Sequence, residues 1–259
     1  MTSPWLRLPL QFDIDQLNTD LARLSDVHWL PHINRQAHNG GWTALSLRSV
    51  HGSTDTITVA DCRQTSYADT PLLSTCSYLP AVLASLHCPL YSARLMSLRA
   101  GASIKRHTDH DLAFEDGCAR LHIPIQTHPD VIFHINDKPV HFGAGECWYM
   151  NANYPHQVTN NSPLERIHLV VDCGVNAWLA DIFHSAGYQS EPQQHKYGDP
   201  AINDSNALQV AHQLEAMGNP TSSTLAARLR MLHQQTDLLA SSTGKETPDT
   251  MNPGYLTDE

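Results

Sequence analysis

The chain has 259 residues, of which 41% are hydrophobic and 16% are charged, a composition typical of a folded globular protein. Its net charge of −10 argues against a nucleic-acid partner, because a phosphate backbone attracts basic proteins. The 17 histidines outnumber the 16 lysines and arginines, and imidazole is the commonest metal ligand, so a metal site is favoured.

Membrane and secretory signals are not found in the sequence. No apolar run approaches the roughly 20 residues that span a bilayer, and the N-terminus lacks the apolar core of a signal peptide. The six cysteines are scattered without a C-x-x-C pair, which predicts reduced thiols and a cytoplasmic protein. The oligomeric state is not indicated.

The first region, to about Tyr91, mixes helical and strand-like segments. A first helix is predicted by apolar residues at helical spacing, namely Ile14, Leu17, Leu21 and Leu24. Residues 42–50 and 56–60 are rich in β-branched and aromatic side chains and predict strands. A second helix is expected to begin near Pro80, because proline suits the first turn of a helix.

Short strand-like runs separated by turn residues follow one another in residues 92–173. They are ARLMSLR, CARLHIPIQ, VIFHI, KPVHF, ECWYM and RIHLVVD. Strands at this spacing predict a mainly β fold, a sandwich or small barrel of the jelly-roll and cupin type. We expect one domain over residues 1–175 with this run as its catalytic core.

Two amphipathic segments separated by GNP (218–220) predict a helical hairpin within residues 176–240. Residues 241–259 are polar and show no periodic pattern, so a disordered tail is expected there.

The histidines of interest lie in two of these segments. IKRHTDHD contains His107-x-Asp109, a pattern expected about once by chance among 17 histidines, so in isolation a solvated turn is the favoured explanation. NANYPHQVTN then places His156 at the start of a strand. Two histidines and one carboxylate can bind one face of a ferrous ion and leave three positions open.

Arg166 follows His156 by ten residues and opens an apolar strand. A guanidinium group is always charged and pairs with a carboxylate through two parallel hydrogen bonds, so Arg166 could hold a dicarboxylate cosubstrate. The alternative is a surface ion pair with a neighbour such as Glu165.

Strand alternation predicts that Arg120 and His122 share one face, and that Arg166 and His168 share another. A barrel that holds an anion can turn such polar faces inward, whereas in an ordinary sheet they would meet water. The sequence leaves this open, and for His168 it favours a structural role.

The run from Leu95 to Cys173 resembles the aspartyl/asparaginyl β-hydroxylase-like family of Fe(II)/2-oxoglutarate dioxygenases. The matching motifs are RLMSLRAGASIKRHTD, RLHIPI, GAGECWYMN, YPH and RIHLVVDC, in that order. The resemblance implies a double-stranded β-helix (jelly-roll) core with N-terminal α/β elements and a C-terminal helical hairpin. It also implies that His107, Asp109 and His156 are the catalytic iron ligands.

For the cosubstrate, the resemblance implies that Arg166 holds the far carboxylate of 2-oxoglutarate and that His122 and Arg120 help to bind its other end. The vertebrate branch of the family has glycine where this chain has Asp109. The carboxylate therefore places the chain nearer the bacterial branch, which includes enzymes similar to L-proline cis-4-hydroxylase.

The activity that the resemblance implies is hydroxylation of an unactivated C–H bond with Fe(II), 2-oxoglutarate and O2, releasing succinate and CO2. The expected substrate is a small amino acid, free or carrier-tethered, with a peptidyl Asp or Asn as the alternative. A non-oxidative cupin-like metal-binding protein is the other possibility, which Arg166 argues against. The acidic loop of residues 110–119 fits a substrate lid as well as a solvated surface loop.

Overall fold

The computed structural model describes residues 3–34, 37–58, 66–109, 112–189, 197, 202 and 205–242. The chain divides into two compact units, Met1–Ser190 and Glu191–Glu259. Each unit is described by itself. The boundary that we predicted at residue 175 stays a prediction. No helix in the described part of the chain is long and apolar enough to cross a membrane.

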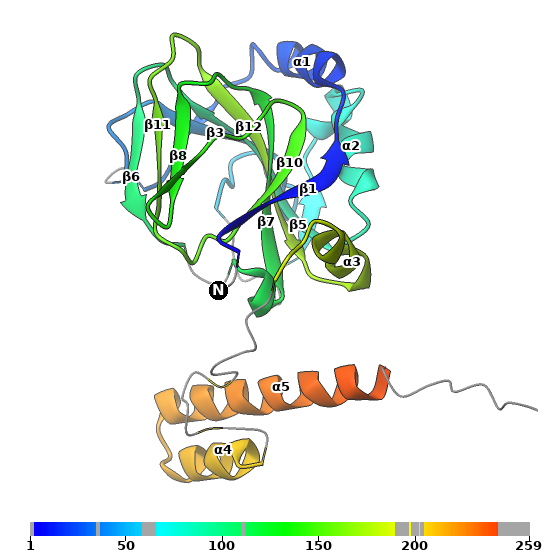
Figure 1. Cartoon of the computed structure of the whole chain (residues 1–259), viewed down its shortest axis with the longest axis vertical. Coiled ribbons are helices and arrows are strands. Elements are labelled where there is room, and N and C mark those ends of the chain that lie inside the picture. The colour runs from blue at the N-terminus through cyan, green and yellow to red at the C-terminus, as the bar shows by residue number, and fades with distance from the viewer. Residues whose placement is uncertain are drawn as a thin grey trace, which may run out of the picture. The chain divides into compact units, whose positions relative to one another are not determined.

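Two antiparallel sheets form the first unit (Figure 1). Among the described residues the larger sheet has the strand order β1-β10-β7-β12-β5-β3-β2, with β4 beside β3, and the smaller has the order β6-β11-β8-β9. The strands of the larger sheet are β1 (Trp5–Gln11), β2 (Leu30–Pro31), β3 (Trp42–Val50), β4 (Tyr67–Asp69), β5 (Leu90–Leu98), β7 (Cys118–Gln126), β10 (Glu146–Met150) and β12 (Arg166–Gly174). Those of the smaller sheet are β6 (Ser103–His107), β8 (Val131–Ile135), β9 (Lys138–Val140) and β11 (His156–Asn160).

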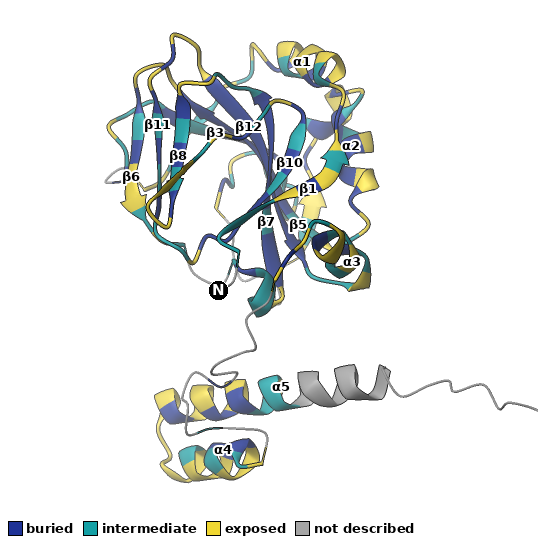
Figure 2. Ribbon diagram, viewed as in Figure 1, coloured by how far each residue is buried: buried dark blue, intermediate teal, exposed yellow. Residues whose placement is uncertain are grey.

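Both faces of the larger sheet are buried, which is why its central strands read as nearly continuous apolar runs (Figure 2). One face packs under three helices, and Leu121 and Leu169 belong to that core. The other face meets the smaller sheet, and Phe133, Phe142 and Val170 belong to the core between the sheets. Because side chains alternate along a strand, the central strands of the larger sheet contribute residues to two cores. One is the outer core under the helices, and the other is the jelly-roll interior between the two sheets.

The helices that cover the outer face are α1 (Ile14–Arg23), α2 (Leu79–Ser85) and α3 (Ala177–Ser185). Asp13 caps α1 by accepting hydrogen bonds from the backbone of Asp15 and Gln16 at 3.0 and 3.1 Å. Asp20 of α1 is buried, and its carboxylate accepts backbone hydrogen bonds from Tyr78 and Leu79 at 2.6 and 2.7 Å. One helix thus satisfies the free N–H groups at the start of the next.

The second unit contains α4 (Ala207–Ala216) and α5 (Pro220–Ser242), which pack against each other. Its buried core includes Ala207 and Ala211 of α4, Ala226 and Leu229 of α5, and Tyr197.

The predicted fold class is confirmed: a jelly-roll core with flanking helices and a C-terminal helix pair. The strand predicted over residues 42–50 and the helices near Ile14 and Pro80 are also confirmed. The strand predicted over 56–60 is wrong for residues 56–58, which are irregular, and 59–60 lie outside the described residues. Of the predicted tail, residues 243–259 also lie outside them, whereas 241 and 242 end α5.

Candidate metal centre

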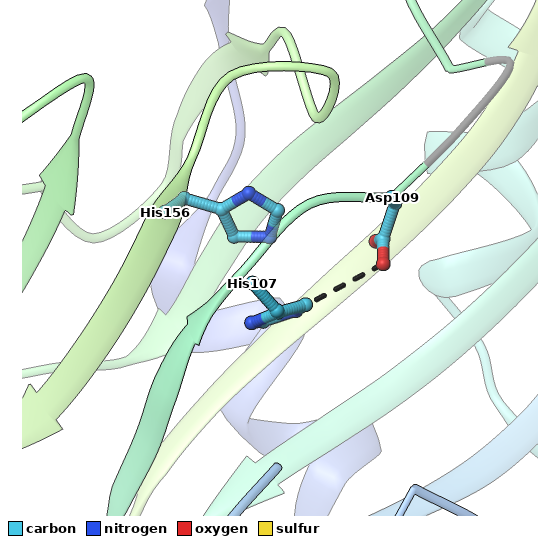
Figure 3. Close-up of side chains that lie close together, drawn as sticks. All are labelled: His107, Asp109 and His156. Atoms are coloured by element: carbon cyan, nitrogen blue, oxygen red, sulfur yellow. Dashed lines mark ion pairs between the residues drawn. The ribbon is translucent and has the colours of Figure 1, made fainter.

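His107 and His156 occupy paired positions on neighbouring strands. His107 ends β6, His156 begins β11, and the two residues face each other in the antiparallel register. Their ring centroids lie 4.3 Å apart, and both rings point toward Asp109 (Figure 3). The two histidines, which the sequence separates widely, therefore meet at one end of the smaller sheet.

Asp109 lies just beyond β6, where its backbone N–H donates to the carbonyl of Ala152 at 3.0 Å. Its Oδ1 lies 3.9 Å from Nε2 of His107. One ligand atom from each of His107, Asp109 and His156 lies within 4.8 Å of the other two. Three donor atoms this close together can bind one face of a single metal ion. Two histidines and one carboxylate are the donor set that binds ferrous iron in this way.

The tautomer of each histidine is determined by a carbonyl two residues before it. Nδ1 of His107 lies 2.8 Å from the Lys105 carbonyl oxygen, and Nδ1 of His156 lies 2.9 Å from that of Tyr154. A carbonyl only accepts hydrogen bonds, so Nδ1 carries the proton and Nε2 keeps its lone pair. This is the arrangement that orients a metal-binding imidazole.

Arg120 holds the second carboxylate oxygen of Asp109. Its Nη1 donates to Oδ2 of Asp109 at 2.5 Å, while its Nε and Nη2 donate to Asp172 at 2.7 and 3.2 Å. Asp172 also accepts from Arg94 at 2.7 Å and from the Ser92 hydroxyl at 2.8 Å. A chain of charges, buried at Arg94 and Asp172, thus occupies Oδ2 of Asp109 and leaves Oδ1 facing His107.

Electrostatics keep both carboxylates ionised. Burial would raise the pKa of Asp172, but the guanidinium groups of Arg120 and Arg94 outweigh it and hold that pKa well below its ordinary value. For Asp109, burial is again opposed mainly by Arg120, and the net effect is a lowered pKa. A deprotonated carboxylate is the form that binds a metal.

Burial also keeps the nearby histidines neutral. It lowers the pKa of His156 to about 4. Burial, reinforced by the charges of Arg120 and Arg166, lowers the pKa of His122 well below its ordinary value, and burial with Arg166 does the same to His168. Neutral imidazole is the form that binds a metal and that can both donate and accept a hydrogen bond.

A second group of polar side chains faces the jelly-roll interior. Arg166, His122 and His168 are all buried, so the alternative that these faces meet water is wrong. Nε and Nη2 of Arg166, and Nε2 of each histidine, have no hydrogen-bond partner among the described residues. Buried polar groups are rarely left unpaired, so the two arginine nitrogens, which can only donate, fit an absent anionic ligand. Burial lowers the pKa of Arg166 to about 10, which leaves it charged at neutral pH.

The two described acids of the 110–119 loop, Glu115 and Asp116, have partners within the protein. Tyr188 donates a hydrogen bond to Glu115. Asn153 donates to Asp116 at 2.9 Å. Asp111 lies outside the described residues.

Sequence reasoning missed Asp172 and Arg94. The signal for Asp172 was present, because it shares strand parity with Arg166 and His168, and alternation alone puts it on the same inward face. Arg94 is opposite Val170 in the neighbouring strand, and only this register shows that its guanidinium can reach Asp172.

The chain is similar in sequence to several known proteins. A family model described as Aspartyl/Asparaginyl beta-hydroxylase matches residues 11–174. An L-proline cis-4-hydroxylase from Rhizobium meliloti is 28% identical over 65% of this chain and 60% of its own length. An L-proline cis-3-hydroxylase from a Streptomyces species is 24% identical over 63% of this chain and 57% of its own length. The chain therefore spans less than two thirds of these relatives.

A solved Pseudomonas putida prolyl-4-hydroxylase has 15% sequence identity and a TM-score of 0.40, covering 67% of this chain and 94% of its own.

Replacing Asp172 by asparagine should destabilise the fold strongly, because two buried guanidinium groups lose a shared counter-ion. Breaking a buried ion pair costs about 3–5 kcal/mol, which urea unfolding at neutral pH would measure. Asp69→Asn, which removes the partly exposed pair with Arg48, is the matched control and should cost at most about 1 kcal/mol. Equal losses in the two variants would contradict the central role of Asp172.

The metal-free protein should lose stability as the pH falls from about 6.5, the ordinary histidine value. The pKa of His156 is about 4 in the folded state, so in this window the unfolded chain binds a proton that the folded chain does not. Each such histidine contributes up to about 1.4 kcal/mol per pH unit.

Urea unfolding of chelator-treated protein over this pH range checks the expectation. His156→Gln should reduce the slope by the share of one histidine, since His122 and His168 remain, and the exposed helix variant His184→Gln is the control. A stability that is constant down to about pH 5 would contradict the neutral state of the buried histidines.

Proposed function

This chain belongs to the aspartyl/asparaginyl β-hydroxylase family, and we propose that it is an Fe(II)/2-oxoglutarate-dependent dioxygenase acting on an amino-acid-type substrate. One observation carries the proposal: a preorganised His107, Asp109 and His156 cluster lies in the same jelly roll as a buried guanidinium, two of whose nitrogens have no hydrogen-bond partner among the described residues. A metal site without a cosubstrate gives no reason to retain such a cation, whose burial is costly.

The residues of the cluster would hold Fe(II) through Nε2 of His107, Nε2 of His156 and Oδ1 of Asp109. Arg120 would position Asp109 by holding Oδ2, so that this carboxylate offers one oxygen. Three ligands on one face leave the remaining positions for a bidentate keto acid and O2. Manganese or zinc can occupy such a donor set too, and the choice of iron rests on the family.

The cosubstrate would be anchored by Arg166, whose Nε and Nη2 suit the parallel hydrogen bonds of a carboxylate. His122 and Arg120 remain the proposed contacts for its keto-acid end. Three nitrogens of Arg120 already donate to Asp109 and Asp172, so only its remaining N–H groups are available for that end.

When bound, iron and 2-oxoglutarate supply the oxidation: one atom of O2 enters the substrate C–H bond, and the other enters succinate as CO2 is released. The protein's own part is to position the substrate and to exclude water. No side chain has to move a proton in this scheme, which agrees with histidines whose pKa is lowered by burial.

A free amino acid is the proposed substrate, supported by the names of the proline-hydroxylase relatives. Arg94 offers a suitable group, because it is buried and its Nε lacks a partner while its other nitrogens bind Asp172 and the Ile57 carbonyl. A substrate carboxylate would satisfy this donor. Peptidyl Asp or Asn is the alternative that a substrate screen must separate.

The direct test measures succinate release with Fe(II), 2-oxoglutarate and O2 over free amino acids, proline included, and over peptides that contain Asp or Asn. We expect a free amino acid to stimulate release and to gain one oxygen atom in its mass. A protein that binds iron but turns over no 2-oxoglutarate with any compound would instead be a cupin-like metal-binding protein.

Replacing Asp109 by alanine should weaken Fe(II) binding by more than about tenfold and abolish succinate release, because one of three ligands is lost. The fold should persist, since Arg120 keeps its ion pair with Asp172. Metal titration followed by thermal unfolding measures both. Asp69→Ala, an exposed acid on β4, is the control. Unchanged iron affinity in Asp109→Ala would contradict the proposed ligand.

Replacing Arg166 by glutamine should raise the dissociation constant of 2-oxoglutarate by more than about a hundredfold, because loss of a buried charged partner costs about 3–5 kcal/mol. Iron binding should change little, since Arg166 is not in the metal cluster. Anaerobic calorimetry on the iron-loaded protein measures the constant. The exposed Arg7→Gln is the matched control, and equal affinities in both variants would refute the role of Arg166.

A further inference from the structure

His168 has a buried ring nitrogen that the proposed site does not use. It lies two residues after Arg166 in β12, so strand alternation puts both side chains on the inward face. The residue is fully buried, and within the part of the chain that the structure describes its Nε2 has no hydrogen-bond partner. An ordinary core histidine would have both ring nitrogens satisfied.

Arg166 and His168 pack against the same aromatic ring. Cζ of Arg166 lies 5.8 Å from the centroid of Phe133, and the His168 ring is stacked on Phe133 at 5.6 Å with an interplanar angle of 18°. Phe142 stacks on Phe133 in turn, at 4.5 Å. The guanidinium of Arg166 and the imidazole of His168 thus lie beside aromatic side chains of the core.

The contact made by the second ring nitrogen limits which nitrogen of His168 can carry the proton. Its Nδ1 lies 3.5 Å from Nδ1 of His122, so one of the two nitrogens donates and the other accepts. A neutral imidazole carries a single N–H. While both rings are neutral, only one of the two Nε2 atoms can therefore be a donor.

We propose that Nε2–H of His168 donates to the far carboxylate of the 2-oxoglutarate cosubstrate and shares that carboxylate with Arg166. The inference rests on the proposed function and extends it by one residue. A carboxylate has more acceptor sites than one guanidinium fork fills, and in an apolar core each unfilled site is costly. His168 is the neighbouring donor on the same face of the same strand.

The assignment also determines the state of His122. Its Nδ1 then donates to His168, and its Nε2 is an acceptor. A neutral His122 then has no N–H left for the keto-acid end, so Arg120 is the donor there, and in place of that contact His122 holds His168 in the donating tautomer.

Two substitutions separate the two ring nitrogens of His168. His168→Asn keeps an amide near the former Nδ1 and removes the group at Nε2. His168→Gln reaches the former Nε2 position with an amide N–H. The binding probes are 2-oxoglutarate and 2-oxobutanoate, which has the same keto-acid end and no far carboxylate. Anaerobic calorimetry on iron-loaded protein gives the dissociation constants without turnover.

We expect His168→Asn to weaken 2-oxoglutarate binding roughly 10- to 100-fold, the value of a hydrogen bond to a charged group. His168→Gln should stay within about threefold of wild type. Binding of 2-oxobutanoate should be the same in all three proteins. His184→Asn, on the exposed surface of α3, is the control for a histidine-to-asparagine change.

The proposal is overturned if His168→Asn binds 2-oxoglutarate as wild type does, or loses affinity for both keto acids equally. If His168→Asn does not fold, His168→Gln still decides, because a folded glutamine variant with a tenfold or greater loss refutes the donor role. Failure of the wild-type protein to bind 2-oxoglutarate would instead overturn the proposed function itself.

Discussion

The carboxylate of Asp172 is the interaction on which the site depends. It is buried and accepts hydrogen bonds from Ser92, Arg94 and Arg120, and Arg120 extends the network to Asp109. These residues come from β5, β7, β12 and the segment after β6, so one anion joins the interior of the larger sheet to the end of the smaller one. Removing one charge from such a network leaves another charge without its counter-ion. The loss of any one member therefore destabilises the others.

Strand alternation explains how one strand serves two functions. In β12 the residues of one parity, such as Leu169 and Val171, pack beneath the helices, while Arg166, His168 and Asp172 face the jelly-roll interior. A shift of register by one residue would exchange these sets and put three polar groups under α1–α3. The packing of the outer core therefore also determines which side chains face the site.

The strands could be predicted from the sequence where a local pattern identifies them. The candidate site could be predicted only in part, because it also depends on how the strands pair. The limits of β3 and β7 coincide with predicted strands because β-branched runs ended by turn residues identify them. The identities of His107, Asp109 and His156 came from a family resemblance; their meeting depends on the register between β6 and β11, which no local pattern contains. The strand β1 was missed because prolines flank and interrupt its short apolar run.

The roles of polar residues were harder to predict because burial decides them. The sequence favoured a structural role for His168 and left open whether Arg166 is exposed to water. Alternation determines on which face of a strand a side chain lies, but not whether other elements cover that face. The smaller sheet covers it here, and Arg166 becomes a buried cation without a protein partner for Nε and Nη2. Glu165 was the alternative ion-pair partner of Arg166 in the sequence, and its carboxylate accepts a hydrogen bond from the Ser97 hydroxyl.

The interior charges oppose those of the whole chain. The protein carries a net charge of −10, yet in the site Arg94, Arg120 and Arg166 outnumber Asp109 and Asp172 by one positive charge, and Arg94, Arg166 and Asp172 are buried. A divalent metal would raise this excess, and a cosubstrate with two carboxylates would then offset most of it. Coulomb attraction is strong at low dielectric, so a dianion gains most from the site after the metal has bound. The acidic exterior contributes little, because salt screens exposed charges beyond about 8–10 Å. The selection of an anionic cosubstrate therefore depends on the buried arginines and not on the overall charge of the protein.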